Sequence, residues 1–322
     1  MKSFWKIVYM SVFVVHLAWS DDARSLKIAF WNVENLFDLI DDPTINDNEF
    51  SIGGKKNVTQ EIYALKLVHS AEVLADLDAD ILGICEVENR FMMEELNKAF
   101  TGRNYKIIHY DSPDRRGIDC ALFYDESKFT VLESKQIKNT LSSGKPTRDI
   151  VYVKGQFGGE ILHVFVNHWP SNYGGREQAI PKRAETARFV REKVEKILNE
   201  DPKAEILLMG DFNEGPNEQN IQYLAKDILI NLMEPFIGKK GVGTYVYRGQ
   251  DSLLDQFIAS SGLLDDKGLK IEDNAVSILD LPKYRQQRGK YQHYPFRFWA
   301  GEKLLGGYSD HLAISVEINL IQ

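Results

Sequence analysis

Short runs of apolar residues recur along the chain at the length and spacing of β-strands. A strand with one or both faces buried reads as an alternating or continuous apolar run of about four to eight residues. Runs of this kind predict strands at 26–33, 80–87, 119–124, 150–157, 161–168, 205–212, 254–260 and 311–318. Many follow one another without an intervening helix, so the pattern favours packed sheets joined by hairpins over a strict β-α alternation.

Two longer segments have apolar residues at helical spacing. The first, 59–75, begins near a capping-box pattern formed by Asn57 and Gln60, and the second is 182–198. Their apolar positions are Ile62, Leu65, Val68 and Leu74 in the first segment and Ala187, Val190, Val194 and Ile197 in the second. Because strands outnumber helices, we expect an α/β fold in which two packed sheets have helices outside, within one domain.

The first twenty residues have the order of a secretory signal peptide. Lys2 and Lys6 precede an apolar stretch that is too short to span a membrane comfortably, and Ala18 and Ser20 occupy the −3 and −1 positions of a small-residue cleavage site. A buried helix is the alternative interpretation. We expect cleavage after Ser20, which leaves a single domain of residues 21–322 that is periplasmic or secreted and has no transmembrane segment.

The composition limits the classes of partner. The chain has 39 basic and 47 acidic residues, and loss of Lys2 and Lys6 with the signal peptide leaves 37 basic residues and a net charge of −10. This acidity argues against a module that binds DNA mainly through counterion release, but it allows an enzyme with a locally cationic site. Cys85 and Cys120 each lie within a predicted strand, so we expect free buried thiols rather than a disulfide.

One segment departs from the acidic balance. This basic aromatic segment, residues 282–301, has five Lys or Arg residues, six aromatic residues and no acid. Such a mixture can hold phosphates and stack on bases. It can equally be an irregular loop whose aromatic side chains pack inward, and the sequence leaves both interpretations open.

Polar side chains stand at the ends of most of the predicted strands. They are Asn32, Glu86, Asp119, His168, Asp211, Asn213, Asp255, Asp310 and His311. Strand ends collect at one edge of a sheet sandwich, so we expect these groups to face one another. Carboxylates such as Glu86 and Asp310 suit Mg²⁺, and two histidines can transfer protons near neutral pH. Taken alone, Asp211 and Asn213 could also be turn residues.

Several competing chemistries lack their characteristic residues. The sequence has no G-x-S-x-G elbow, no zinc-ligand cluster at helical spacing and no glycine loop that ends in Lys-Ser or Lys-Thr. Three further histidines, His69, His109 and His163, are interpreted as surface or packing residues. The remaining pattern is that of a metal-assisted phosphate-ester hydrolase.

Seven short motifs occur in an order that resembles the endonuclease/exonuclease/phosphatase superfamily, which includes deoxyribonuclease I. They are WNVENLFD, ICEVEN, RGIDCALFY, NHWPS, GDFNE, LDQFIAS and GGYSDHLAI, and they extend from Trp31 to Ile314. G-D-x-N followed by a later S-D-H is the specific part of this pattern. The resemblance implies a four-layer α/β/β/α sandwich of two packed mixed sheets with outer helices. It also favours Asp211 and Asn213 as site residues over turn residues.

The resemblance implies a metal site and a water-binding site. The cofactor is expected to be Mg²⁺, with Mn²⁺ or Ca²⁺ as other candidates, and Glu86 is the principal ligand with support from Asn32 and Asp310. Asp211 and Asn213 are expected to orient the attacking water and the phosphate.

The resemblance also implies two catalytic histidines, each steered by an acid. His311, steered by Asp255, is expected to act on the phosphate or to activate water. His168, steered by Asp119, is expected to face it across the scissile bond as a candidate general acid for the leaving oxygen.

Two arginines are candidate substrate contacts. Arg148 could meet a phosphate oxygen, with a surface ion pair as the alternative. Arg176 is a weaker candidate together with Lys182 and Arg183, because a solvated helix start explains these residues equally well.

Three functions remain open at this point. The first is an exported Mg²⁺-dependent phosphodiesterase, in its simplest form a nuclease that acts on nucleic acid. The second is a phosphatase or phospholipase that acts on lipid head groups or inositol phosphates, and the third is a non-catalytic binding module. The complete set of site residues disfavours the third. The basic aromatic segment and the lack of an exposed apolar hairpin favour the nuclease, and no protein partner is implied.

Overall fold

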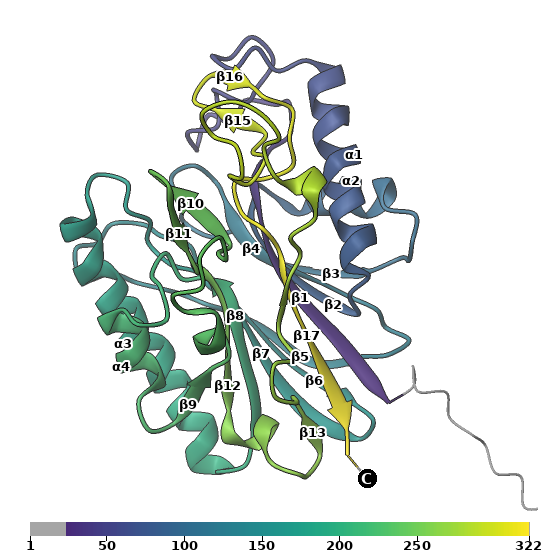
Figure 1. Cartoon of the computed structure of the whole chain (residues 1–322), viewed down its shortest axis with the longest axis vertical. Coiled ribbons are helices and arrows are strands. Elements are labelled where there is room, and N and C mark those ends of the chain that lie inside the picture. The colour runs from purple at the N-terminus through teal and green to yellow at the C-terminus, as the bar shows by residue number, and fades with distance from the viewer. Residues whose placement is uncertain (1–23, 322) are drawn as a thin grey trace, which may run out of the picture.

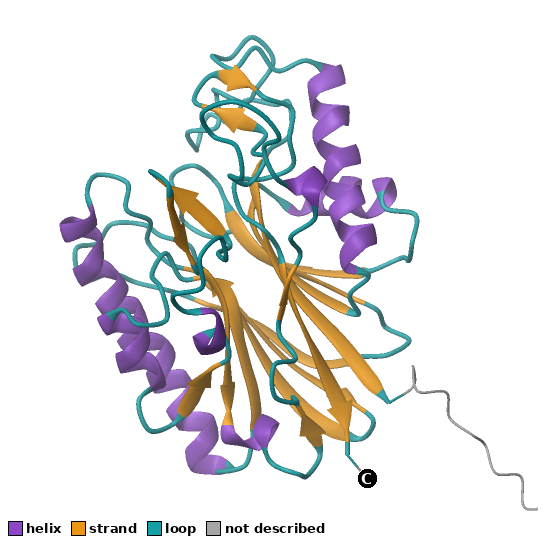
Figure 2. Cartoon of the chain, viewed as in Figure 1, coloured by secondary structure: helices purple, strands orange, loops and turns teal. Residues whose placement is uncertain are grey.

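Two β-sheets lie face to face at the centre of the molecule, and helices cover their outer faces (Figure 1; Figure 2). The computed structural model describes residues 24–321, so the expected signal peptide lies outside the described residues. The two large sheets are both mixed, and the expected α/β/β/α sandwich is confirmed.

The first sheet has seven strands and joins the N-terminal and C-terminal parts of the chain. Its strand order is β13-β17-β1-β2-β4-β3, with β14 also paired to β17. These strands are β1 (Ser25–Leu36), β2 (Ile81–Val87), β3 (Lys106–His109), β4 (Asp119–Tyr124), β13 (Leu269–Lys270), β14 (Ser277–Ile278) and β17 (Ile314–Leu320).

The second sheet is built from the middle of the chain. Its strand order is β5-β6-β7-β8-β12-β9, and two small hairpins, β10-β11 and β15-β16, lie outside both sheets. The strands are β5 (Thr130–Ile137), β6 (Ile150–Phe157), β7 (Glu160–His168), β8 (Glu205–Asp211), β9 (Leu229–Asn231), β10 (Tyr245–Tyr247), β11 (Gln250–Ser252), β12 (Asp255–Ser260), β15 (Trp299–Ala300) and β16 (Lys303–Leu304). All eight expected strands are present, and the ones that the pattern missed are short or half-exposed.

Helices cover each sheet on its outer side. Beside the first sheet lie α1 (Gln60–Leu77) and α2 (Arg90–Ala99), and beside the second lie α3 (Arg176–Glu200) and α4 (Gln219–Ala225). Single 3₁₀ turns occur at η2 (Glu234–Phe236), η3 (Ser261–Leu264) and η4 (Pro282–Tyr284). Among residues 24–321, no helix combines the length and the apolar character that a membrane span needs.

Both expected helices exist, but their starts differ from the prediction. The cap of α1 is Thr59, whose hydroxyl accepts a hydrogen bond from the Ile62 amide at 3.3 Å, whereas Asn57 lies in the preceding turn at a φ of 51°. Helix α3 begins before its expected start and runs through Pro181. Pro181 is the sixth residue of this helix and lies beyond its first turn, so the helix lacks one intrahelical hydrogen bond at this point.

The alternation of side chains along each strand divides the core into layers. In β1, Ile28 and Phe30 pack between the two sheets, while Ala29 and Trp31 pack against the helices of the first sheet. The second sheet contributes an equivalent outer layer against α3 and α4. Cys85 and Cys120 are opposite each other in the β2–β4 pairing and are free and buried, as expected.

Candidate active site

Asp211 is the centre of the polar cluster at the strand ends. Strand pairing places it between His168 at the end of β7 and Asp255 at the start of β12. Its Oδ2 atom lies 3.1 Å from Nδ2 of Asn32, 3.6 Å from Nε2 of His168 and 3.8 Å from Nε2 of His311. Residues from both sheets therefore converge on one carboxylate oxygen, as the strand-end argument predicts.

His311 is held by an acid from the other sheet. Its Nδ1 lies 2.7 Å from Oδ2 of the fully buried Asp255, so the expected contact between these two residues is present. The ring of Tyr245 packs on the imidazole, with ring centres 4.8 Å apart. Burial alone would lower the pKa of His311, but the charges of Asp255 and Asp211 raise it well above its usual value. The two carboxylates therefore favour the charged imidazolium form of His311.

The expected contact between His168 and Asp119 is wrong. Oδ2 of Asp119 lies 3.0 Å from Nε2 of His109, and its Oδ1 accepts a hydrogen bond from the Ser112 amide at 2.8 Å. Nδ1 of His168 is buried without a hydrogen-bond partner among the described residues. Asp119 belongs to the first sheet and His168 to the second, and the adjacent strand β3 brings His109 to Asp119 instead.

His109 is therefore more than the packing residue that the sequence indicates, since it pairs with a buried acid. His168, in contrast, has a pKa well below its usual value because it is buried and because Arg148, Arg116 and His311 lie near it. The site thus shifts the pKa values of its two histidines in opposite directions. Environments that push two pKa values apart are typical of acid–base pairs in enzymes.

The carboxylate of Asp211 shares this environment. Burial raises its pKa to about 7, with an opposing contribution from His311 and a further increase from Asp255. Its Oδ1 accepts a hydrogen bond from the Asn213 amide at 2.9 Å, and Nδ2 of Asn213 donates to the Trp169 carbonyl at 3.1 Å. Within the G-D-x-N motif, the backbone of Asn213 therefore fixes the Asp211 carboxylate, while the Asn213 side chain is fixed by Trp169.

Glu86 and Asp310, the expected metal ligands, flank this cluster. Oε2 of Glu86 accepts a hydrogen bond from the Asn35 amide at 3.1 Å, and its Oε1 lies 4.0 Å from Nε2 of His168. Oδ2 of Asp310 accepts from Arg297 at 2.9 Å. Both side chains keep partial solvent access, 14% for Glu86 and 20% for Asp310.

Asn32, the expected supporting metal ligand, contacts Asp211 directly. Its Oδ1 accepts a hydrogen bond from the Glu34 amide at 3.0 Å, and its Nδ2 donates to Asp211. The amide orientation follows from these partners, since an N–H needs an acceptor and a carboxylate needs a donor. In this arrangement Asn32 orients Asp211.

The donor set of the cluster fits a divalent cation. Glu86 and Asp310 offer hard carboxylate oxygens with solvent access, and Mg²⁺ binds few carboxylates while it keeps several waters. Ligand atoms of Asp211, Asp255 and His311 also lie within 4.8 Å of one another. These groups can hold a metal, and the division of ligands between them remains a prediction.

Several site residues have a strained backbone. Glu34, Asn35, Glu86 and Asn213 have φ angles of 53°, 55°, 65° and 52°. Non-glycine residues rarely adopt this left-handed conformation, and where they do they cluster at functional sites. The hydrogen bonds described above stabilise the strained conformations and fix the directions of the Glu86 and Asn213 side chains.

A buried charge network next to Asp310 was not predicted from the sequence. Glu34 accepts hydrogen bonds from the amides of Phe298 and Trp299, and its Oε1 lies 3.3 Å from Arg297. Burial, followed by the charge of Asp310, raises the pKa of Glu34 to about 7. Glu34 lies within the WNVENLFD motif, which is the signal that could have revealed it.

A second buried charge completes this network. Lys66 of α1 donates to the Val33 carbonyl at 2.5 Å and to the Tyr308 carbonyl at 2.8 Å. Burial lowers the pKa of Lys66 to about 8, against the opposing charge of Glu34. The network joins α1 and β1 to the segment that carries Asp310.

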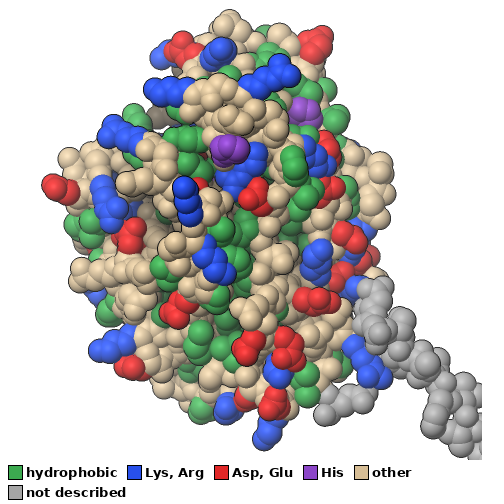
Figure 3. Space-filling model, in the orientation of Figure 1, with side chains coloured by type: hydrophobic (Ala, Val, Ile, Leu, Met, Phe, Trp, Pro, Cys, Tyr) green, Lys and Arg blue, Asp and Glu red, His purple; other side chains and the backbone are tan. Residues whose placement is uncertain are grey.

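The basic aromatic segment mostly follows the packing interpretation. Tyr284, Phe298 and Trp299 are buried, and three of the five basic residues are ion-paired. These pairs are Lys283 with Glu72 and Asp76, Arg285 with Asp280, and Arg297 with Glu34 and Asp310. Figure 3 shows Lys and Arg side chains spread over the upper half of the face on which this segment lies in Figure 1.

The structure does not bring the expected substrate arginines into the cluster. Arg148 is buried rather than on the surface, and it binds Asp114 at 3.2 Å and the Trp169 carbonyl at 2.5 Å. Arg176 is exposed and paired with Glu218 at 2.8 Å. Arg183 is fully buried, so the solvated helix start suggested for it is wrong.

Arg116, which the sequence analysis did not single out, lies beside Glu86 and Asn35. Its guanidinium lies 3.6 Å from Oε1 of Glu86 and 3.3 Å from Oδ1 of Asn35, and 41% of its side chain is exposed. Arg116 opens the RGIDCALFY motif, which is the sequence signal that could have identified it.

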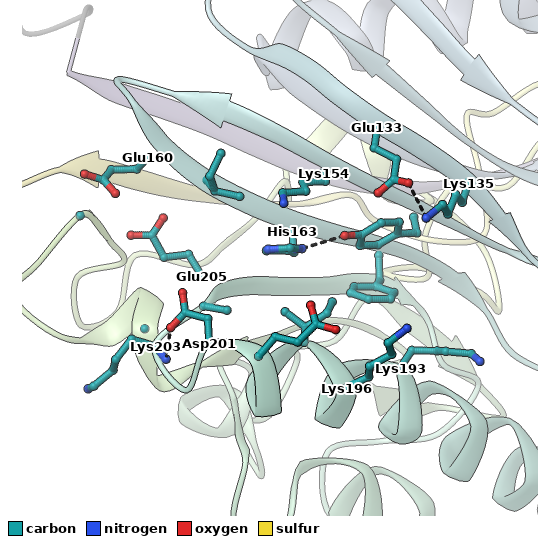
Figure 4. A pocket seen from close by; sticks show the side chains of 18 of the residues that line it. Glu133, Lys135, Lys154, Glu160, His163, Lys193, Lys196, Asp201, Lys203 and Glu205 are labelled. Carbon is teal, nitrogen blue, oxygen red and sulfur yellow. Dashed lines mark hydrogen bonds and ion pairs between the residues drawn. The ribbon is translucent and has the colours of Figure 1, made fainter.

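A separate groove lies between the outer face of the second sheet and α3 (Figure 4). Its volume is about 1140 Å³, and its lining includes Lys154, Lys196, Glu205 and His163. Nδ1 of His163 lies 2.8 Å from the Tyr152 hydroxyl. None of the expected site residues lines this groove, so its size does not make it the catalytic centre.

Comparison with known families identifies the fold and the family. The Endonuclease/Exonuclease/phosphatase family matches residues 27–320, and the chain belongs to this family. Its members hydrolyse phosphate esters with the help of divalent metals, so the coarse prediction of a phosphoesterase is confirmed. No curated protein matches the sequence.

Solved structures show the same fold at low sequence identity. D. rerio TDP2 in complex with a single-strand DNA product has a TM-score of 0.59 and 16% identity, over 92% of this chain and 99% of that one. The human Nocturnin catalytic domain with a bound sulfate anion has 0.59 and 18%, over 92% and 94%. The Bacteroides thetaiotaomicron mannosyl-6-phosphatase Bt3783 has 0.59 and 19%, over 91% and 99%.

Proposed function

We propose that this chain is a Mg²⁺-dependent hydrolase that cleaves phosphodiester bonds of nucleic acid. The observation that carries the proposal is the convergence of His311 and His168 on Asp211, next to the carboxylates of Glu86 and Asp310. Two histidines whose pKa values shift in opposite directions, together with a nearby cation-binding group, are the parts that such a hydrolysis needs.

The chain's own residues account for most of the chemistry. Attack on a phosphodiester builds negative charge on the non-bridging and leaving oxygens. The Nε2–H of His311 can donate to one of these oxygens, while Asp255 holds its Nδ1 and preserves the imidazolium. Asp211, fixed by Asn32 and Asn213, is placed to orient the attacking water. A bound Mg²⁺ would stabilise the developing charge as a Lewis acid.

His168 completes the arrangement from the opposite sheet. Its low pKa keeps it neutral, so it can accept a proton but needs prior protonation before it can act as an acid for the leaving oxygen. This differs from the general-acid role expected for it. The structure therefore favours His311 as the proton donor and leaves His168 to bind or deprotonate water.

Nucleic acid is the substrate that local chemistry favours. In the basic aromatic segment, Arg288, Lys290 and Tyr291 are exposed, and Nζ of Lys290 lies 5.5 Å from the centre of the Tyr291 ring. Exposed cations beside aromatic rings suit phosphates and stacked bases. D. rerio TDP2, which has this fold, has been solved in complex with a single-strand DNA product, and this supports nucleic acid as the substrate class.

We also propose that the protein is exported. This rests on the order of residues in the predicted signal peptide, which lies outside the described residues. After expression of the full chain in a bacterial host, the protein should be recovered outside the cytoplasm with Asp21 as its first residue. A cytoplasmic protein with an intact N-terminus would overturn this part.

The test of function is nicking of supercoiled plasmid by residues 21–322, with Mg²⁺ or with a chelator. His311→Ala, prepared identically, controls for contaminating nuclease. Nicking that needs both Mg²⁺ and His311 would support the proposal. If plasmid remained intact while bis(4-nitrophenyl) phosphate, 4-nitrophenyl phosphate or an inositol or lipid phosphate was cleaved, the substrate would be another phosphate ester. No hydrolysis of any ester would overturn the catalytic function.

A further inference from the structure

Arg116 lies in the loop between β3 and β4, and hydrogen bonds within this loop fix its shape. In the β3–β4 connection, Oδ1 of Asp114 accepts a hydrogen bond from the Arg116 amide at 2.9 Å, and its carbonyl accepts one from the Gly117 amide at 3.0 Å. Gly117 has a φ of 69°, and a Cβ there would meet the side chain of Ile45. The turn therefore requires glycine and determines where the Arg116 side chain begins.

A buried arginine ties this loop to the second sheet. Arg148 binds Oδ2 of Asp114 at 3.2 Å and the carbonyl of Trp169 at 2.5 Å, and Trp169 directly follows His168. Asp114 and Arg148 are both less than a tenth exposed. Charge-assisted hydrogen bonds in a buried setting hold geometry well. Arg148 thus places the loop, and with it Arg116, relative to the strand end that carries His168.

The guanidinium of Arg116 keeps most of its hydrogen-bonding capacity free. It has five N–H donors, and its partners among the described residues are Oδ1 of Asn35 and, at a longer 3.6 Å, Oε1 of Glu86. Another arginine near the cluster, Arg297, is instead held by both Glu34 and Asp310. Of these two guanidinium groups, Arg116 is the one with donors left for a ligand.

The site is rich in carboxylates, so the free donors of Arg116 matter for binding an anionic substrate. Glu86, Asp211, Asp255 and Asp310 would repel an anionic substrate, and Arg116 adds a permanent positive charge next to Glu86. A phosphodiester has two non-bridging oxygens. A cation bound at Glu86 would contact one of these oxygens, and the guanidinium of Arg116 beside it can contact the other.

We infer that Arg116 is a substrate-binding residue that contacts a non-bridging oxygen of the phosphoryl group on which this site acts. The inference rests on the proposed function and identifies the phosphate-binding side of the site. Arg148, which the sequence suggests for this contact, acts as a positioning residue through Asp114.

The neighbouring Arg115 provides a matched control. It is exposed, carries the same charge, and its side chain has no hydrogen bond or ion pair among the described residues, while its backbone carbonyl accepts from the Asn46 amide at 2.7 Å. Removal of either arginine changes the net charge equally. A difference between Arg115→Ala and Arg116→Ala therefore reports on position rather than on overall charge.

Binding and turnover test the inference separately. Binding of inorganic phosphate in the presence of Mg²⁺ is measured by calorimetry, and kcat and KM are measured with bis(4-nitrophenyl) phosphate, for Arg116→Ala, Arg116→Lys and Arg115→Ala. Arg116→Ala should weaken phosphate binding roughly 10- to 100-fold and lower kcat/KM by a similar factor, as expected for lost hydrogen bonds to a charged group. Arg116→Lys should recover part of the binding, because it restores a point charge without the planar fork.

The inference is overturned if Arg116→Ala binds phosphate as the wild type does, or if Arg115→Ala loses as much as Arg116→Ala. Thermal unfolding of each variant verifies folding, and Arg116→Lys serves if the alanine variant does not fold. Phosphate binding that depends on Arg116 in a protein that cleaves no ester would retain the inference and reject the proposed function. Ester cleavage that is unaffected by Arg116→Ala would reject the inference and retain the proposed function.

Discussion

Nδ1 of His311 and Oδ2 of Asp255 lie 2.7 Å apart, although 56 positions separate them in the chain. Asp255 is fully buried and begins β12, whereas His311 precedes β17 in the other sheet. The contact joins the two sheets at the edge where the polar residues meet. It also leaves Nε2 of His311 directed at Asp211, at 3.8 Å.

Asp255→Asn should move the pH dependence of turnover. The charges of Asp255 and Asp211 hold the pKa of His311 well above its usual value, so the protonated form persists to high pH. Loss of one charge lowers this pKa, and the alkaline limb of the kcat profile should shift to lower pH. If His311 transfers a proton, His311→Ala should cost roughly 10²- to 10⁴-fold in kcat. An unchanged pH profile in Asp255→Asn would contradict this role.

Glu86→Gln should raise the Mg²⁺ concentration needed for half-maximal activity. The substitution keeps the shape of the side chain but removes the charge that a hard cation requires, and we expect roughly a 10- to 100-fold change. The Tm without metal should change little, because Glu86 is partly exposed. Identical Mg²⁺ titrations for the variant and the wild type would remove Glu86 from the ligand set.

His168→Ala and Asp119→Asn should behave differently. Because Asp119 binds His109 and not His168, Asp119→Asn should lower stability while turnover stays within a few-fold of the wild type. His168→Ala should reduce turnover roughly 10²- to 10⁴-fold if it handles a proton. Measured kcat and Tm values for both variants distinguish the loss of stability from the loss of turnover. Equal losses of kcat would mean that Asp119 does act through His168 during catalysis.

Glu214→Gln should destabilise the fold strongly. Oε1 of Glu214 lies 2.8 Å from Nε of Arg183, and both side chains are almost completely buried. Removal of one charge leaves the other buried without a counterion, at a cost of about 3–5 kcal/mol. The exposed pair of Arg176 and Glu218 is the matched control, and Glu218→Gln should cost no more than about 1 kcal/mol. Urea denaturation measures both, and similar values for the two variants would refute the argument.

His163 should make the protein less stable as the pH falls below about 6.5. Burial, followed by the charge of Lys154, lowers the pKa of His163 from 6.5 to about 4. Between these values the unfolded chain binds a proton that the folded chain does not, so protonation favours unfolding. In His163→Gln this contribution is absent. The stability of the wild type relative to the variant should fall between pH 7 and pH 4.5, and a constant difference would contradict the low pKa.

The strands and the general location of the site follow from local sequence. An apolar run such as 205–212 predicts a buried strand because burial of its side chains drives its formation. A polar residue directly after that run, such as Asp211, is placed at a sheet edge by the same reasoning. The motifs then indicate that the edges of both sheets coincide, which the contacts of Asn32 with Asp211 and of His311 with Asp255 bear out.

The tertiary structure alone decides which residues become partners. The pairing of Asp119 with His109, the burial of Arg148 and the exposure of Arg116 depend on which strands are neighbours and on how one loop turns at Gly117. The sequence lists residues with the right chemistry, but hydrogen bonds and charge interactions act over only a few ångströms. Contacts between segments as distant as β4 and β7 therefore arise from packing of the two sheets, which no local pattern encodes.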